Sequence, residues 1–131
     1  MIDFRNMDCM DLMAEYEDNH FDLAIVDPPY GIGAHKTLGF ATKKTKGFNF
    51  KAKEYKDKGW DNETPPVEYF EELKRVSKNQ IIWGANYFAD KIGNMKNFIY
   101  WHKKGQSKDE KFNEGEFAFT TIGRSRMVDI W

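Results

Sequence analysis

Blocks of apolar and polar residues predict short strands and helices in the first part of the chain. Residues 2–7 predict a strand, and Asp8 predicts the N-cap of a helix, a position where Asp is favoured. Four residues follow at helical spacing: Cys9, Leu12, Met13 and Tyr16. Residues 21–26 are apolar except for Asp22, and the run ends at two prolines. Such a run predicts a strand buried on both faces, as in a parallel sheet.

The second half repeats this alternation. Thr64 and Pro65 predict a helix start, because a cap followed by proline suits the first helical turn. One face of that helix would carry Tyr69, Phe70, Leu73 and Val76. Residues 79–83 predict the next strand, after which Asn86 would cap a short helix that ends at Gly93.

Three more strands are predicted towards the C-terminus. They cover residues 98–101, 117–121 and 127–131, and the last two would form a hairpin around Gly123. Strands that alternate with helices predict an α/β domain with a largely parallel sheet. Ligands of such sheets bind beyond the carboxyl ends of the strands, where residues 27–30 stand.

Composition narrows the class of protein. The chain has 131 residues, which suits one domain, and its 16% aromatic content argues against disorder throughout. No apolar run reaches the ~18–20 residues that span a bilayer. The N-terminus lacks the regions of a secretory signal, so we expect a soluble, cytoplasmic protein without a membrane partner. The single cysteine, Cys9, excludes an intrachain disulfide and an all-thiolate zinc site.

Charge is distributed unevenly, although the net charge is only -1. Residues 1–30 hold eight acidic residues and one basic residue, whereas residues 31–58 hold eight lysines and two acidic residues. Residues 31–59 lack a steady period, and a connection this long is typical of a functional or a disordered loop. The basic segment is therefore either a phosphate-binding loop or an ordinary solvated loop. His20 and His102 have no partners at metal-ligand spacing, so no metal site is predicted.

The tetrapeptide Asp27-Pro28-Pro29-Tyr30 combines groups that suit one kind of substrate. The two prolines stiffen the backbone and lack the N–H groups that other residues would donate. The main-chain oxygens of Asp27 and Pro28 therefore retain the capacity to accept hydrogen bonds. The Asp27 carboxylate and the Pro28 carbonyl could accept both hydrogens of an exocyclic amine, while Tyr30 stacks on its ring. Accepting both hydrogens stabilises the positive charge that develops when the nitrogen attacks an electrophile. The alternative is a plain turn that ends a strand.

This tetrapeptide and its surroundings resemble the amino-group DNA methyltransferases, in the group whose catalytic motif precedes the cofactor motif. The resemblance covers nearly the whole chain, in the family's order: residues 6–9, 21–31, 60–61, 68–78, 81–86 and 98–103. It implies a Rossmann-like S-adenosylmethionine-dependent methyltransferase fold, with a mostly parallel sheet and helices on both faces. It also implies methyl transfer from S-adenosylmethionine to the N6 amine of adenine in DNA, in a restriction–modification or phage-related setting.

The resemblance also implies a role for each motif residue. Asp27 and Pro28 would hold the target amine, Tyr30 would stack on the flipped base, and Pro29 would line the substrate site. Asp8 would accept a hydrogen bond from the adenine amine of S-adenosylmethionine, with Asp27 also next to the cofactor. The alternative for Asp8 is a helix N-cap alone. An Asp at the head of the tetrapeptide favours adenine-N6 over cytosine-N4.

Further candidates concern DNA. Lys43, Lys44 and Lys46 are candidate contacts to the DNA backbone, which would make affinity fall with salt. Trp60 either lines the base pocket or belongs to the core, and His35 either contacts phosphate or is an ordinary loop histidine. Trp83 and Trp101 are predicted to lie in the core.

One family feature is missing, the Phe-x-Gly-x-Gly-like cofactor loop after a strand. The only Gly-x-Gly is Gly31-Ile32-Gly33, which we interpret as a hinge rather than a cofactor loop. We therefore expect residues 1–131 to be a single but partial catalytic domain, incomplete at the C-terminus. Such a chain would be a fragment of a longer enzyme, a naturally shortened relative, or half of an assembly that a homodimer or a second chain completes. The alternative is a truncated, non-catalytic DNA-binding or assembly-dependent remnant.

Overall fold

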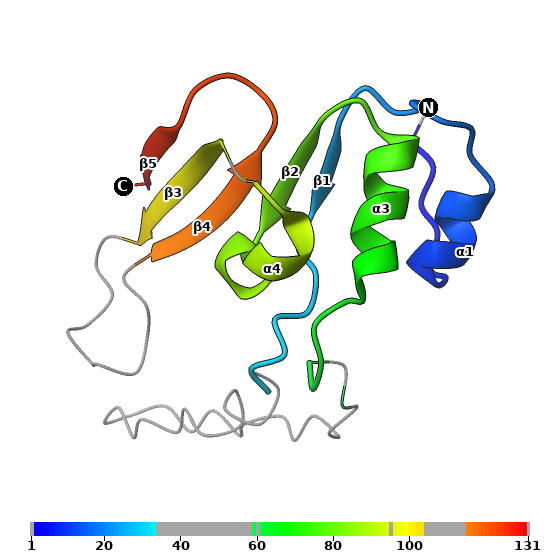
Figure 1. Cartoon of the computed structure of the whole chain (residues 1–131), viewed down its shortest axis with the longest axis horizontal. Coiled ribbons are helices and arrows are strands. Elements are labelled where there is room, and N and C mark those ends of the chain that lie inside the picture. Colours follow the sequence, from blue (N-terminus) through cyan, green and yellow to red (C-terminus); the bar gives the residue numbers. More distant parts are fainter. Residues whose placement is uncertain (1, 34–58, 60, 95, 104–114, 131) are drawn as a thin grey trace, which may run out of the picture. The chain divides into compact units, whose positions relative to one another are not determined.

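The computed structural model describes residues 2–33, 59, 61–94, 96–103 and 115–130. Their elements are α1 (Cys9–Ala14), β1 (Ala24–Val26), α3 (Val67–Val76), β2 (Gln80–Trp83), the 3-10 helix η2 (Ala85–Tyr87), α4 (Ala89–Ile92), β3 (Asn97–Lys103), β4 (Gly115–Thr120) and β5 (Arg126–Ile130) (Figure 1). The chain divides into a first unit, Met1–Pro28 with Pro65–Trp131, and a second unit, Pro29–Thr64. All helices and strands named here belong to the first unit.

The first unit is built on a five-stranded sheet in the order β1-β2-β4-β3-β5. β1 pairs with β2 in parallel and β3 with β5 in parallel, whereas β4 is antiparallel to both β2 and β3 (Figure 1). The α/β class is confirmed, but the prediction of a mostly parallel sheet is wrong, because the sheet is mixed. β3 and β4 are neighbours in the chain and in the sheet, and antiparallel neighbours need no crossover helix.

The predicted C-terminal hairpin is also wrong. β5 does not pair with β4 but with β3, in the register Tyr100 opposite Met127 and Trp101 opposite Val128. β4 has β2 and β3 as its two neighbours, so neither of its edges remains for β5. Gly123, with a φ of 71°, lies in the connection that brings the chain to the far side of β3.

The core lies around α3, as the helical spacing predicts. Tyr69, Phe70, Leu73 and Val76 are buried on one face, and the rings of Phe70 and Phe88 are 5.3 Å apart. The helix begins later than predicted, because its N-cap is Pro66 rather than Thr64. α4 does end at Gly93, which has a φ of 85°, but its N-cap is Phe88, and Asn86 lies exposed within η2.

The N-terminal predictions are wrong in two places. Residues 2–7 form no strand, and Ile2 and Phe4 are 95% and 92% exposed. The strand predicted over residues 21–26 is reduced to β1 at the edge of the sheet, where Ile25 is 62% exposed rather than buried. The side chains of an apolar strand are buried on both faces only where other elements cover both faces of the sheet.

Burial within the sheet is also one-sided. In β2, Gln80 and Ile82 are buried, whereas Ile81 and Trp83 on the opposite face are half-buried. The expectation of helices on both faces is therefore not confirmed, and Trp83 and Trp101 are half-buried rather than core residues. Among the described residues, no helix has the length and apolar character to cross a membrane.

Candidate functional site

The first half of the tetrapeptide follows the last residue of β1. Val26 is level with Ile82 in the parallel pair, so Asp27 reaches the level of Trp83, the last residue of β2. Asp27 is exposed and Pro28 is buried. The structure therefore places both residues at the carboxyl ends of two adjacent parallel strands, where α/β sheets bind their ligands.

Two indoles meet at the same end of the sheet. Trp83 of β2 and Trp101 of β3 lie on either side of β4, with ring centroids 6.1 Å apart and planes at 78°. Lys103 Nζ lies 5.1 Å from the Trp101 ring centroid and forms an ion pair with Glu116. Trp101 Nε1 is buried without a hydrogen-bond acceptor among the described residues. Sequence reasoning assigned both tryptophans to the core because they lie on predicted strands, but both are half-buried.

The second half of the tetrapeptide belongs to the second unit, where Pro29 and Tyr30 are half-buried. Within this unit, the N–H of Gly31 donates to Asp61 Oδ1 at 2.8 Å. The N–H of Gly33 donates to the main-chain oxygen of Asp61 at 2.9 Å. Because the N–H groups of Gly31 and Gly33 both donate to Asp61, they are not available to bind a phosphate or a cofactor. Sequence analysis had noted Asp61 only as part of the resemblance.

The backbone conformation and the close packing at position 31 both favour glycine. Its φ is 71°, and a Cβ there would lie 3.1 Å from both the N and the Cγ2 of Thr64. Gly33 has a φ of 64°. The left-handed backbone agrees with a glycine requirement, but the bonds to Asp61 make this turn a fixed one rather than a simple hinge.

Asp8 has the N-cap geometry that the sequence predicts. Its φ and ψ are -62° and 135°, and its Oδ1 accepts the N–H of Met10 at 2.8 Å. The side chain is exposed. The capping interpretation is confirmed, and the contact to a cofactor stays a prediction.

Several candidates lie outside the described residues: His35, Lys43, Lys44, Lys46 and Trp60. Among the residues that are described, no group of His, Cys, Asp and Glu side chains could hold a metal ion. His20 instead packs against the rings of Tyr16 and Phe21, with centroids 4.6 and 4.8 Å away.

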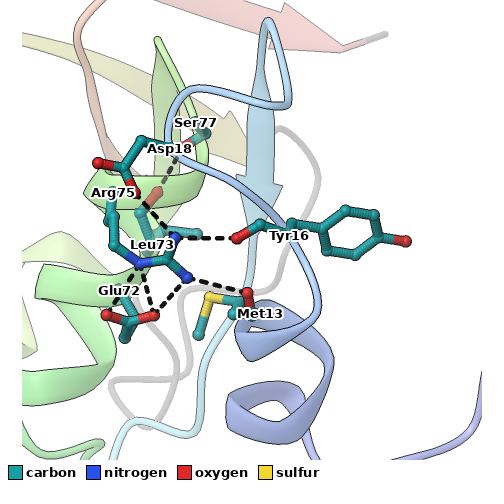
Figure 2. Close-up of polar contacts among 7 residues, drawn as sticks. All are labelled: Met13, Tyr16, Asp18, Glu72, Leu73, Arg75 and Ser77. Carbon is teal, nitrogen blue, oxygen red and sulfur yellow. Dashed lines mark hydrogen bonds and ion pairs between the residues drawn. The ribbon is translucent and has the colours of Figure 1, made fainter.

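A cluster around Arg75 fixes the segment that begins with Asp8 (Figure 2). The guanidinium of Arg75 donates to Glu72 on its own helix and to Asp18. It also donates to the main-chain oxygens of Met13 and Tyr16, at 3.0 and 2.9 Å. Hydrogen bonds with Glu72, and then Asp18, raise the pKa of Arg75 above its usual value. Sequence reasoning missed this cluster, for which the three-residue spacing of Glu72 and Arg75 was the only signal.

No protein-family model matches the chain, and the search of curated proteins finds no match.

Proposed function

We propose that this chain is a DNA methyltransferase domain that transfers a methyl group to the exocyclic N6 amine of adenine. The observation that carries the proposal is the position of Asp27 and Pro28 directly after β1, level with the end of parallel strand β2. The resemblance of the tetrapeptide and its flanking segments to the amino-group DNA methyltransferases supports the same reaction.

The groups at this position match the needs of an amine nucleophile. The exposed carboxylate of Asp27 would accept one amine hydrogen, and the main-chain oxygen of Pro28 the other. Holding both hydrogens orients the nitrogen lone pair away from the ring and stabilises the positive charge that develops during transfer. Tyr30 would stack on the base once it has left the duplex.

The cofactor of this reaction is S-adenosylmethionine, whose sulfonium supplies the methyl group. Asp8 fits a role in binding it, since its exposed carboxylate has acceptor capacity beyond the one bond to Met10. The Gly31–Gly33 turn does not fit such a role, because both of its glycine amides donate to Asp61.

The test is methyl transfer from labelled S-adenosylmethionine to unmethylated genomic DNA. Asp27→Ala should lower the rate by about 10²–10³-fold, a loss typical of one preorganised electrostatic contact. Because Asp27 is exposed, the variant should keep the circular dichroism spectrum of the parent chain. The matched control is Asp90→Ala, another exposed aspartate, on α4, which should transfer at the parent rate.

A second candidate function is an assembly-dependent methyltransferase subunit. The observation that favours it is the exposed edge strand β1, where Ile25 is 62% exposed. Strand edges with exposed apolar residues are common pairing sites for another chain. Analytical ultracentrifugation of the purified chain tests this candidate, which predicts that the chain is a dimer. Ile25→Lys should dissociate the dimer, and the resulting monomer should transfer no methyl group.

A further inference from the structure

The second unit contains the only charged side chain that is buried in the described part of the chain. Asp61 is 1% exposed. Burying a carboxylate is costly unless hydrogen bonds compensate for the lost water. The bond from the N–H of Gly31 provides such compensation, and bonds of this charge-assisted kind are stronger than neutral ones.

Asp61 holds the turn after Tyr30 at two points. Its side chain accepts the N–H of Gly31, and its main chain accepts the N–H of Gly33. The turn is also tightly packed, since a Cβ on Gly31 would lie 3.1 Å from two atoms of Thr64. These contacts restrict the backbone next to Tyr30, whose ring is the part of the proposed site that would stack on a base.

We propose that Asp61 is a positioning residue for the transfer reaction, because it fixes the orientation of Tyr30. The inference rests on the proposed function. Asp61 does not contact the reacting atoms; it acts through the Gly31 amide and the adjacent Tyr30 backbone. A misplacement of about 1 Å at a reacting centre costs about a hundredfold in rate, so the turn needs a rigid anchor.

The first arm of the test uses neither DNA nor cofactor. Amide exchange of Gly31 is measured by nitrogen-15 NMR. The ring of Tyr30 is followed by fluorine-19 NMR in protein carrying 3-fluorotyrosine, with the resonance assigned through Tyr30→Phe. Asp61→Ala should accelerate Gly31 exchange and shift or broaden the Tyr30 resonance. Asp61→Asn keeps an oxygen acceptor at the same place, so it should restore both signals.

The second arm measures kcat and KM in the transfer assay with unmethylated genomic DNA. Asp61→Ala should lower kcat by about ten- to a hundredfold, with KM for S-adenosylmethionine changed less than about twofold. Asp61→Asn should recover most of the lost kcat. The matched control is Glu63→Gln, because Glu63 is an exposed carboxylate in the same unit. This variant should change neither the NMR signals of the first arm nor the kcat and KM of the second. If Asp61→Ala does not fold, Asp61→Ser replaces it, since its shorter side chain does not reach Gly31.

The two arms distinguish failure of the positioning role of Asp61 from failure of the proposed function. Unchanged Gly31 exchange and an unchanged Tyr30 resonance in Asp61→Ala overturn the positioning role, whatever the activity. A changed resonance with parental kcat overturns it as well. If the parent chain transfers no methyl group, the proposed function fails, and with it the role of Asp61 in the reaction. The first arm then still decides whether Asp61 fixes Tyr30.

Discussion

Arg75 Nη2 on α3 donates a hydrogen bond to the main-chain oxygen of Met13, 3.0 Å away at the end of α1 (Figure 2). The last carbonyl groups of a helix have no partner within that helix. The Met13 oxygen accepts the N–H of Tyr16, beyond the helix, at 3.1 Å, and the guanidinium adds a second donor from a neighbouring helix. Tyr16 contributes a second main-chain oxygen to the same guanidinium. Arg75 therefore attaches the short helix that follows Asp8 to the core helix α3.

Replacing Arg75 should destabilise the fold in a graded way. Arg75→Ala should lower the urea midpoint of unfolding, because it leaves the Met13 and Tyr16 oxygens without this donor. Arg75→Lys should lower the midpoint less, since a lysine keeps the charge but not the planar fork. The control is Lys78→Ala, which breaks the exposed ion pair with Asp22 and should have little effect. An Arg75→Ala midpoint equal to that of the parent would contradict this role.

Tyr69 should make stability depend on pH in the alkaline range. Burial, with a smaller contribution from Cys9, raises the pKa of Tyr69 to about 12, against an ordinary value near 10. The unfolded chain therefore loses this proton first, and the stability present below about pH 10 is lost as pH rises towards 12. The loss amounts to about 2 kcal/mol. Tyr69→Phe should show a shallower decline between pH 10 and 12 in urea unfolding, and a decline as steep as the parent's would contradict the burial argument.

Phe70 should contribute more to stability than any exposed aromatic residue. It is 0% exposed and packs against Phe88, so Phe70→Ala should cost about 3–5 kcal/mol of unfolding free energy. The matched control is Phe98→Ala, since Phe98 is 47% exposed and should cost roughly 1 kcal/mol or less. Chemical denaturation measures both, and equal losses would show that the core lies elsewhere.

The packing at Gly31 can be separated from its backbone conformation. Gly31 and Gly123 share a φ of 71°, but a Cβ added at Gly31 would have neighbours within 4 Å, from Thr64 and Glu63, whereas one added at Gly123 would have none. Alanine at either position introduces a left-handed strain of about 1–2 kcal/mol. Gly31→Ala should therefore lower the melting temperature more than Gly123→Ala. The same loss for both would mean that the contact with Thr64 relaxes without cost.

The sequence predicted well those features that depend on residues close together in the chain. The buried face of α3, the cap at Asp8 and the end of α4 at Gly93 depend on residues within about two helical turns of each other. The strand partners were not predictable in this way. The pattern of residues 127–131 predicts a strand, but nothing in that pattern indicates that β5 pairs with β3 rather than β4.

The candidate site shows the same division. The end of β1 at Val26, directly before Asp27, followed from an apolar run that stops at Asp27 and two prolines. The bonds from Gly31 and Gly33 to Asp61 join segments about thirty residues apart, so no local pattern could reveal them. The exposure of Ile25 likewise depends on what covers its face of the sheet, and an apolar run in the sequence does not show which elements pack against it.

The central claim is that this chain methylates adenine in DNA through Asp27. The most direct test incubates the purified chain with S-adenosylmethionine and unmethylated DNA, digests the DNA to nucleosides and identifies them by mass spectrometry. The account predicts N6-methyldeoxyadenosine with the parent chain and, in the same reaction time, about 10²–10³-fold less of it with Asp27→Ala. An N4-methyldeoxycytidine product, no methylated nucleoside, or equal product from the two chains would contradict it.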